Sequence, residues 1–371
     1  LGDVYKRQVE ANPTYTACPL SNLVLTTDRP IGAQQFGYAD LRKVGIGVIL
    51  SRATAVDPVA HSVELANGEQ LTYDRLVISP GIDLRSDALP GYSETAYDRM
   101  PHAWQAGAQT LLLKQQLNSM ADGGLVVMSV PDNPYRCPPG PYERASLIAR
   151  YLMSNKPGSK LLVLDAIDRF SKQPLFMAAW REQYGDLLEW QGRSSGAEVI
   201  SVAPDEMRLD TDFDSVTADV ANVIPPQQAG AIAAIAGVAD ASGWCPIEPL
   251  TFESRLQPDI HVIGDAAIAN AMPKSAFSAN AQAKLCAAQI NRMLTGEPPI
   301  GTTLINTCYS LVNPEYGISV AGVYRPDPDH WLEVDGAGGT SPMAAGPEVR
   351  ALEASYARDW YKAMTAQVFG T

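Results

Sequence analysis

The chain has little of what marks several common classes of protein. Its five cysteines are too few for a disulfide scaffold and show no CxxC spacing, which argues against a zinc site or a thioredoxin-type motif. No apolar run approaches the roughly 18–20 residues of a membrane helix, so we expect no membrane span. The four histidines do not cluster and there is no CxxCH, so we expect neither a metal site nor a haem site in this chain.

Positive charge is also scarce. The 28 Lys and Arg residues against 41 Asp and Glu residues give a net charge of −13 at pH 7, which argues against binding to nucleic acid or to an anionic membrane surface. The charge suits a partner with a positive face, although it could equally serve solubility alone. With 371 residues, of which 46% are hydrophobic, the chain is long enough for two or three globular domains.

The amino-terminal end lacks the GxGxxG turn that follows the first strand of a dinucleotide-binding domain. Residues 1–8 have no apolar signal-peptide core and do not read as a strand, so we interpret them as foreign to the native protein. Val9-Glu10 would then end a strand whose beginning is lost, with most of one βαβ unit of roughly 30 residues missing before it. Glu10 is either the acid that binds the adenosine ribose or a solvated loop acid.

Two strand ends farther along carry residues suited to a nucleotide. In the segment 262–267 (VIGDAA), an apolar strand ends in Gly264-Asp265. Such an end can place a carboxylate on a sugar hydroxyl, and a helix that follows it points backbone N–H groups at a phosphate. A second apolar strand runs into a Pro80-Gly81 break, and we count both residues with Gly264 and Asp265 as candidates for cofactor binding.

Apolar strands alternate with helical patterns along most of the chain, which predicts α/β sheets with crossover connections. We expect strands at 46–50, 125–130 and 160–165, helices at 102–120, 142–153 and 275–294, a hairpin around Asn67-Gly68, and a hairpin-like return at 215–224. Residues beyond Gly301 lose this rhythm and are expected to form a separate element.

The loop after the strand 125–130 is unusual. Residues 131–141 contain five prolines and one glycine. Because proline has no N–H and stiffens the chain, this loop is a poor cradle for a phosphate, and we predict that a nicotinamide site is absent from this position. Cys137 lies in the loop just before a helix expected from Tyr142, so it is either a reactive thiolate or a buried inert cysteine.

Seven short motifs together give the chain a family resemblance over about residues 9–369. They are YTACPLSN (15–22), CPPGPYERA (137–145), VIPPQ (223–227), GWCP (243–246), HVIGD (261–265), MPKS (272–275) and NTCYS (306–310). The set resembles the flavoprotein subunit of flavocytochrome c sulfide dehydrogenase, a family related to sulfide:quinone oxidoreductases and to the glutathione-reductase fold.

The resemblance implies an FAD site. Cys18 stands where this family can bond the flavin 8α-methyl covalently, although some relatives bind flavin without that bond. Asp265 matches the acid that holds the ribityl and phosphate region. Lys274 would lie near the isoalloxazine, or else be a lysine whose stem covers the surface.

The resemblance also implies a redox site. Cys137 and Cys308 match the family's two redox cysteines, which form a disulfide beside the flavin that sulfide attacks. Glu143, at the start of the following helix, is a candidate proton acceptor, or else a first-turn acid that complements the helix dipole.

The implied fold is α/β, with two Rossmann-like three-layer dinucleotide-binding domains, as in glutathione reductase, plus a C-terminal α+β element. We expect the FAD-binding domain at 1–100 and 226–300, a second Rossmann-like domain with a degenerate NAD site at 101–225, and a flavin-binding and interface domain at 301–371. The implied function is periplasmic oxidation of sulfide with FAD, electrons passing to a cytochrome c subunit that carries the haem. The alternatives are a membrane-associated sulfide:quinone oxidoreductase-like enzyme and an inactive flavoprotein fragment.

Overall fold

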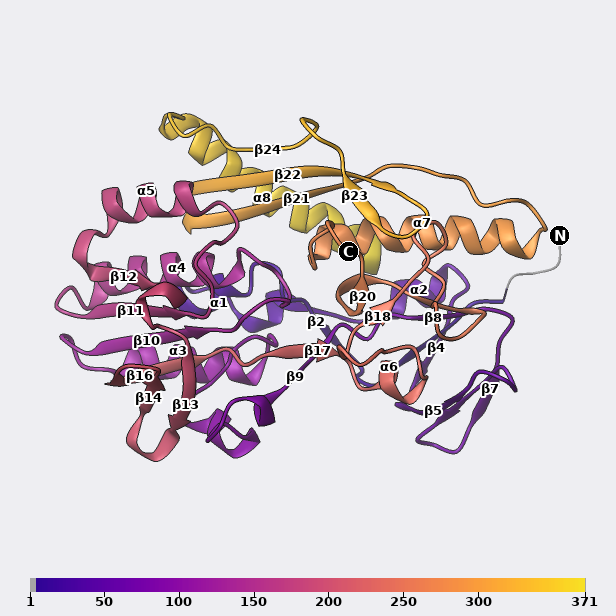
Figure 1. Cartoon of the computed structure of the whole chain (residues 1–371), viewed down its shortest axis with the longest axis horizontal. Helices are drawn as coiled ribbons and strands as arrows, with labels where there is room; N and C mark the ends of the chain where they lie inside the picture. The colour runs from indigo at the N-terminus through magenta and orange to yellow at the C-terminus, as the bar shows by residue number, and fades with distance from the viewer. Residues whose placement is uncertain (1–4, 371) are drawn as a thin grey trace.

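Residues 5–370, which the computed structural model describes, form two α/β halves with a C-terminal sheet and helix lying along both (Figure 1). The first half comprises residues 5–84 and 227–300, and the second half residues 85–226. The chain crosses between the halves through the antiparallel pair β9 (Ile82–Leu84) and β17 (Gln227–Ala229).

The second half is built on a four-stranded parallel sheet in the order β12-β11-β10-β16. Its strands are β10 (Leu125–Val130), β11 (Lys160–Asp165), β12 (Leu188–Gln191) and β16 (Val220–Val223). Side chains alternate between the two faces of a strand, and every residue of β10 after Leu125 is buried, so both faces must be covered.

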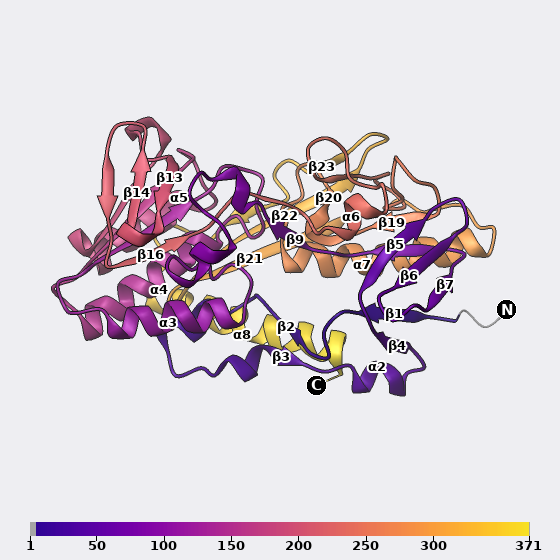
Figure 2. The ribbon, with the colours of Figure 1, turned by 90° about the horizontal axis from the view of Figure 1, so that it is seen from below.

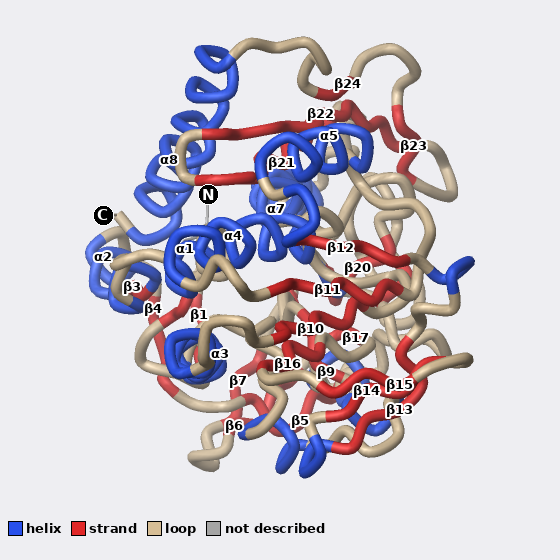
Figure 3. The backbone as a smooth tube through the Cα atoms, turned by 90° about the vertical axis from the view of Figure 1, so that its left-hand side faces the viewer, coloured by secondary structure: helices blue, strands red, loops and turns tan. Residues whose placement is uncertain are grey.

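Helices cover one face of this sheet and a small antiparallel sheet covers the other, which gives three layers (Figure 3). Val126 and Met128 of β10 join the core beneath the helices, whereas Val127 packs on the opposite side. The covering elements are α3 (Ala108–Ser119), α4 (Gly140–Asn155) and α5 (Gln173–Gln183) on one face, and β13 (Val199–Ala203), β14 (Arg208–Thr211) and β15 (Ser215–Thr217) on the other.

The first half holds two parallel strand pairs, β1 with β4 and β8 with β19, and the antiparallel sheet β5-β6-β7. Figure 2 shows β1 and β4 beside the β5-β6-β7 sheet. The bounds are β1 (Arg7–Glu10), β4 (Gly47–Leu50), β5 (Ala53–Asp57), β6 (Ser62–Leu65), β7 (Gln70–Thr72), β8 (Leu76–Ile78) and β19 (Ile260–Val262). Its shorter elements are β2 (Tyr15–Thr16), β3 (Gln35–Phe36), α2 (Ala39–Lys43), α6 (Ile232–Ile235), β18 (Cys245–Pro246) and β20 (Ala267–Ile268). Helix α1 (Asn22–Thr26) instead packs against α3 and α4 of the second half.

The C-terminal region joins the halves. The long hairpin of β21 (Leu304–Asn313) and β22 (Tyr316–Pro326) extends along both halves in Figure 1, with β23 (Trp331–Glu333) and β24 (Gly339–Thr340) paired to β22. Helix α8 (Pro347–Phe369) packs on this hairpin, while α4 and α7 (Ala276–Leu294) also pack against β21. Strand β21 therefore meets a helix from each half. Among residues 5–370, no helix has both the length and the apolar composition needed to cross a membrane.

The predicted fold class is confirmed, and the strands 125–130 and 160–165 have the predicted bounds. Three details differ. The predicted return at 215–224 is wrong, because β15 pairs with β14 whereas the fully buried β16 pairs in parallel with β10. The helix predicted at 102–120 begins only at Ala108, since the Arg144 guanidinium binds the carbonyls of His102 and Ala103.

The third difference concerns the amino-terminal segment. Arg7 and Gln8 belong to β1, where they pair with Gly47 and Val48, although we predicted no strand there. The Arg7 guanidinium donates to the Thr72 carbonyl at 2.6 Å, a contact that sequence cannot reveal. Residues 1–4 of the segment lie outside the described residues.

Candidate active site

Cys137 lies in the loop between β10 and α4, at a φ of +60°. This left-handed conformation costs a non-glycine residue about 1 kcal/mol, so other contacts must hold it. The Cys137 N–H donates to the Lys274 carbonyl at 2.7 Å, and the Gly140 N–H donates to the Cys137 carbonyl at 2.7 Å. The loop is thereby tied to the MPKS segment of the first half.

The start of α4 does not favour a thiolate at Cys137, contrary to one of our two interpretations. Pro138, Pro139 and Pro141 have no N–H, and the Gly140 N–H is already used. Burial raises the pKa of the Cys137 thiol, as do the nearby Cys308 and Glu143, while Lys172 opposes the rise. A Cβ on Gly140 would lie only 3.0 Å from the Cys137 Sγ, so the sulfur packs directly against the helix start.

Cys308 lies on β21, and the structure brings it close enough to Cys137 for their charges to interact. Both cysteines are partly exposed, and all five cysteines of the chain are free thiols here. Asn306 lies two residues earlier on the same strand and therefore on the same face. Its Nδ2 lies 3.3 Å from the Cys308 Sγ.

Lys172 is a site residue that the sequence analysis missed. It precedes α5 at a φ of +62° and is 5% exposed. Its Nζ donates to the Cys308 carbonyl at 2.9 Å and to the Ser310 Oγ at 2.7 Å. Burial lowers the pKa of Lys172 to about 8, while negative charge on Cys308, Glu143 and Cys137 opposes the change. No local pattern marks this lysine, because its partners lie far along the chain.

Glu143 is held by two amide donors. Its Oε1 accepts from the Leu311 backbone N–H at 2.9 Å, and its Oε2 accepts from the Asn22 Nδ2 at 2.9 Å. Burial raises the pKa of Glu143, and these hydrogen bonds and the charge of Lys172 oppose the rise. Glu143 thus joins α4 to β21 and to α1, and it lies beside the two cysteines.

The predicted cofactor residues meet at the carboxyl ends of β8 and β19. These strands pair in parallel, and the Ile263 N–H donates to the Ile78 carbonyl at 3.2 Å, which brings Pro80-Gly81 and Gly264-Asp265 to the same edge. The Lys274 Nζ donates to the carbonyls of Asp265 and Ala267 at 2.7 and 3.0 Å.

Lys274 also lies over an aromatic ring. Its Nζ is 3.8 Å from the centroid of the Trp244 ring, which identifies the GWCP motif as part of the same neighbourhood. Burial lowers the pKa of Lys274 to about 8, opposed by Asp265 and Cys245. The amine is therefore fixed at the site rather than extended along the surface.

Two buried polar atoms at this edge fit a flavin. The Asp265 Oδ1 and the Gln227 Nε2 find no hydrogen-bond partner among the described residues. Strand β17, which begins at Gln227, packs against the turn at Gly264–Ala266. Buried polar groups are almost always paired, so an unpaired acceptor and an unpaired donor fit the hydroxyls and polar ring edge of FAD.

Arg136 connects this edge to the cysteines. Burial lowers its pKa, but negative charge on nearby Cys18, Asp265 and Cys137 outweighs that effect, so the pKa is raised. Its guanidinium is anchored to the Trp104 carbonyl at 2.5 Å. Arg136 thus lies among three residues that the sequence analysis assigned to the flavin or to the redox pair.

Two further candidates, Cys18 and Glu10, come from the amino-terminal part of the chain, and Cys18 lies near Arg136. The Gln34 amide donates to the carbonyls of Ala17 and Pro19, at 2.8 and 2.7 Å, which fixes the backbone on both sides of Cys18. Glu10 ends β1, and its Oε1 accepts from the Gln8 Nε2 at 2.6 Å.

At the corresponding position of the second half, the acid is paired within the protein. Asp165 ends β11, where the acid of a dinucleotide-binding domain would bind ribose. Instead, its Oδ2 accepts from the Tyr142 hydroxyl and the Trp190 Nε1, each at 2.8 Å. The ring of Phe170 stacks on Tyr142, with the ring centroids 3.6 Å apart. These contacts occupy the carboxylate that a ribose would need, and the loss of a nicotinamide site stays a prediction.

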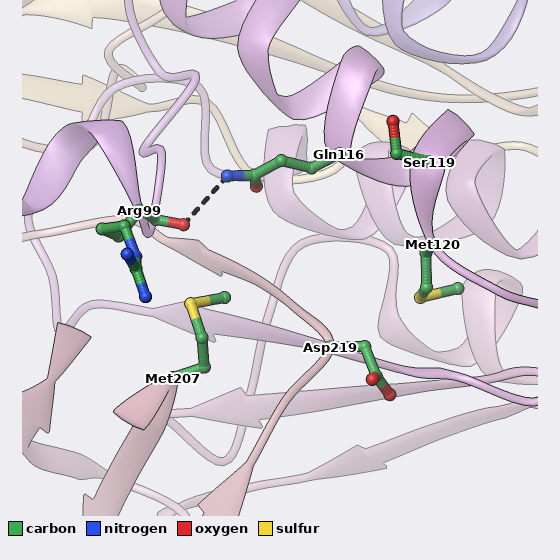
Figure 4. A pocket seen from close by; sticks show the side chains of 6 residues that line it. All are labelled: Arg99, Gln116, Ser119, Met120, Met207 and Asp219. Atoms are coloured by element: carbon green, nitrogen blue, oxygen red, sulfur yellow. Dashed lines mark hydrogen bonds between the residues drawn. The ribbon is translucent and has the colours of Figure 1, made fainter. Parts of the chain in front are cut away.

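Two surface hollows lie in the second half, one of them beside Asp165 and Phe170. One of about 280 Å³ lies between the loops after β10 and β11, lined by Asn133, Tyr135, Pro138, Ile167, Arg169, Phe170 and Ser171. The other, of about 310 Å³, is bordered by Asp219 and Gln116, whose Nε2 donates to the Arg99 carbonyl at 3.0 Å (Figure 4). Asp219 precedes β16, so this second hollow lies at the edge of the sheet opposite to Cys137.

Two family models match the chain. The central part of the sulfide dehydrogenase (flavocytochrome c) flavoprotein chain matches residues 110–225, and the flavin-binding part of flavocytochrome c sulphide dehydrogenase matches residues 301–369. The mitochondrial sulfide:quinone oxidoreductase of Mus musculus is 22% identical over 237 residues, covering 60% of this chain and 50% of that protein. The chain thus spans about half the length of this curated relative.

Solved structures agree on the fold. The sulfide:quinone oxidoreductase of Aquifex aeolicus superimposes with a TM-score of 0.72 at 16% identity, covering 97% of this chain and 85% of that one. A ferredoxin reductase from Rhodopseudomonas palustris gives a TM-score of 0.63 at 17% identity, covering 86% and 76%. The solved structures show only the fold, whereas the similarity to sulfide dehydrogenase flavoproteins rests on the two family models. Residues 110–225 and 301–369 are therefore those of a flavocytochrome c sulfide dehydrogenase flavoprotein or of a sulfide:quinone oxidoreductase-like protein.

Proposed function

We propose that the protein is an FAD-dependent sulfide dehydrogenase that uses a Cys137–Cys308 disulfide and passes its electrons to a cytochrome c. The observation that carries the proposal is the meeting of Cys137, Cys308 and Lys172 where α4, α5 and β21 converge. Arg136 lies near both Cys137 and Asp265, and so connects this group to the proposed flavin site at the carboxyl ends of β8 and β19. A redox pair beside a flavin edge is the arrangement that this chemistry requires.

In the first step, hydrosulfide attacks one sulfur of the disulfide. The S–S bond between the cysteines breaks, a new S–S bond forms to the incoming sulfur, and the other cysteine leaves as a thiolate. Lys172, whose pKa is about 8, is mostly cationic at pH 7 and can stabilise the negative charge that enters with hydrosulfide. Glu143 lies close enough to take up a proton, and its raised pKa suits that role.

FAD, when bound, accepts electrons in pairs and releases them singly, as a haem acceptor needs. The residues that would hold it are Asp265 and Gln227 through their unpaired atoms, with Lys274 and Arg136 supplying positive charge. Cys18 is the residue we propose for a covalent link. Its backbone is fixed on both sides by Gln34, which would keep the thiol at one position against the flavin.

The proposed acceptor is a cytochrome c with a basic face, which the net charge of −13 would attract. A quinone is the second candidate, because the curated relative from Mus musculus and the Aquifex aeolicus structure are both sulfide:quinone oxidoreductases. Comparing the rates at which the sulfide-reduced protein reduces cytochrome c and a short-chain quinone, each at low ionic strength, distinguishes the two. Raising the salt concentration should slow only the cytochrome reaction.

The test of the proposed function is the visible spectrum of the FAD-loaded protein under anaerobic conditions. We expect sulfide to bleach the flavin band of the natural protein, and Cys308→Ser to bind flavin equally well but to resist bleaching. NADH serves as the control, and we expect no reaction because the acid that would bind its ribose, Asp165, is paired with Tyr142 and Trp190. Bleaching of Cys308→Ser by sulfide, or bleaching by NADH alone, would overturn the proposal. A chain that binds no FAD would favour the inactive fragment.

A further inference from the structure

The side chain of Asn306 lies between Cys308 and the start of α7. Its Oδ1 accepts from the Ser275 hydroxyl at 2.6 Å and from the Ser278 hydroxyl at 3.1 Å. Ser275 is the N-cap of α7, and its Oγ accepts from the Ser278 backbone N–H at 3.1 Å. Asn306 is 2% exposed, so this network is shielded from water.

These contacts orient the amide. With both hydroxyls on the oxygen, the amide nitrogen faces the Cys308 Sγ at 3.3 Å, and an amide nitrogen can only donate. The Cys308 thiol in turn lies 3.7 Å from the Asn306 Oδ1. A buried donor aimed at a sulfur stabilises that sulfur most when it is negatively charged, because charge-assisted hydrogen bonds are stronger than neutral ones.

Cys137 has no such donor among the described residues. The helix start beside it is occupied by three prolines and by Gly140, whose N–H is used by the Cys137 carbonyl. Burial raises the pKa of the Cys137 thiol. Lys172 does not offset this difference, because its charge acts on both cysteines, and the charge of Arg136 near Cys137 does not outweigh the effect of burial.

We propose that Asn306, held in place by Ser275 and Ser278, stabilises Cys308 as the leaving thiolate and thereby directs hydrosulfide to Cys137. The reaction is HS⁻ plus the Cys137–Cys308 disulfide, giving a persulfide (–S–SH) on Cys137 and a thiolate on Cys308. One S–S bond breaks, one forms, and the negative charge passes from hydrosulfide to Cys308. The sulfur with the better-stabilised anion departs faster in such exchanges. The direction of attack rests on the proposed function, whereas the stabilisation of Cys308 does not.

The first experiment measures that stabilisation without sulfide or turnover. The purified protein, reduced with dithiothreitol and freed of it, is treated with iodoacetamide at pH 7, and mass spectrometry follows the alkylation of each cysteine with time. We expect Cys308 to react faster than Cys137. Asn306→Ala should slow Cys308 about tenfold, as expected for loss of one charge-assisted donor, and leave Cys137 unchanged.

Three further variants make this experiment specific. Asn306→Asp, which has nearly the same shape, should slow Cys308 at least as much because a carboxylate repels a thiolate. Ser278→Ala should slow it about threefold, since one of two orienting hydroxyls is lost. Asn291→Ala, an exposed asparagine on the same helix, is the matched control and should change nothing. Equal alkylation rates for Cys308 in the natural protein and in Asn306→Ala would overturn the proposal, provided both melt at the same temperature.

The second experiment locates the incoming sulfur. The oxidised protein receives one equivalent of sulfide anaerobically, is quenched with an alkylating reagent, and is digested for mass spectrometry. We expect the additional sulfur on the Cys137 peptide, and additional sulfur on the Cys308 peptide would overturn the direction of attack. Absence of additional sulfur on both peptides would instead contradict the proposed function, and the alkylation rates would then still decide the role of Asn306.

Discussion

The two halves of the molecule end a parallel strand in the same way and use that end differently. Asp265 follows β19 in the first half and keeps a buried carboxylate oxygen without a partner among the described residues. Asp165 ends β11 in the second half, and both its oxygens accept hydrogen bonds, from Tyr142, Trp190 and the Ile167 N–H. A buried carboxylate oxygen without a partner is available to a ligand, whereas Asp165 already accepts three hydrogen bonds within the protein.

The largest expected effect is the loss of stability when Asp165, the paired acid of the second half, is replaced. Asp165→Ala leaves the Tyr142 hydroxyl and the Trp190 N–H without a partner and creates a cavity, so we expect a loss of about 4 kcal/mol of unfolding free energy. Urea denaturation followed by circular dichroism measures this loss. FAD affinity of the folded protein should not change, and a weaker affinity would contradict a purely structural role for Asp165.

The unpaired acid should behave in the opposite way. Asp265→Ala removes an acceptor that is available to a ligand, so we expect FAD affinity to fall about 100-fold. The stability of the flavin-free protein should stay the same or rise, because a buried carboxylate without a partner is lost. Flavin fluorescence titration and urea denaturation test the two parts. A flavin-free variant as unstable as Asp165→Ala would show that the two acids do not differ.

The pH dependence of stability sharpens the same comparison. Burial raises the pKa of Asp165 to about 6, so the folded state holds a proton that the unfolded state, with a pKa near 3.9, has released. Stability should therefore decline as the pH rises from about 4 to about 6, by about 3 kcal/mol, and this contribution should level off above pH 6. Urea denaturation across this range checks the slope. Asp165→Asn cannot titrate and should lose that part of the slope, so an unchanged slope would assign it to other groups.

The smallest effect is expected at Gln227. Gln227→Leu removes the unpaired Nε2, and we expect FAD affinity to fall about fivefold, since one neutral donor is lost. Gln227→Glu is the comparison variant, because it keeps the acceptor for the Arg136 backbone N–H, removes the donor and adds a carboxylate. Titration with FAD should therefore show weaker binding for both variants. If only the leucine variant binds weakly, the Arg136 contact is what matters.

Cofactor and redox candidates could be named from sequence only where they lie in distinctive local patterns. Gly264-Asp265 follows an apolar strand, and Cys137 lies among five prolines. Lys172 has no such signal, because its partners Cys308 and Ser310 come from a different element. Asn306 and Gln227 lie in motifs that supported the resemblance, yet their roles depend on which atoms lack or find a partner.

The sequence by itself determined the alternation of strands and helices, the strands 125–130 and 160–165, and a proline-rich loop with few N–H groups to offer a phosphate. These features follow from local periodicity and from the missing N–H of proline, which act wherever the segment lies. Tertiary structure alone decided that Asp165 is paired whereas an Asp265 oxygen is not, and that Asn306 reaches Cys308. Pairing and burial depend on side chains supplied by distant segments, and therefore on how the two halves pack around β21.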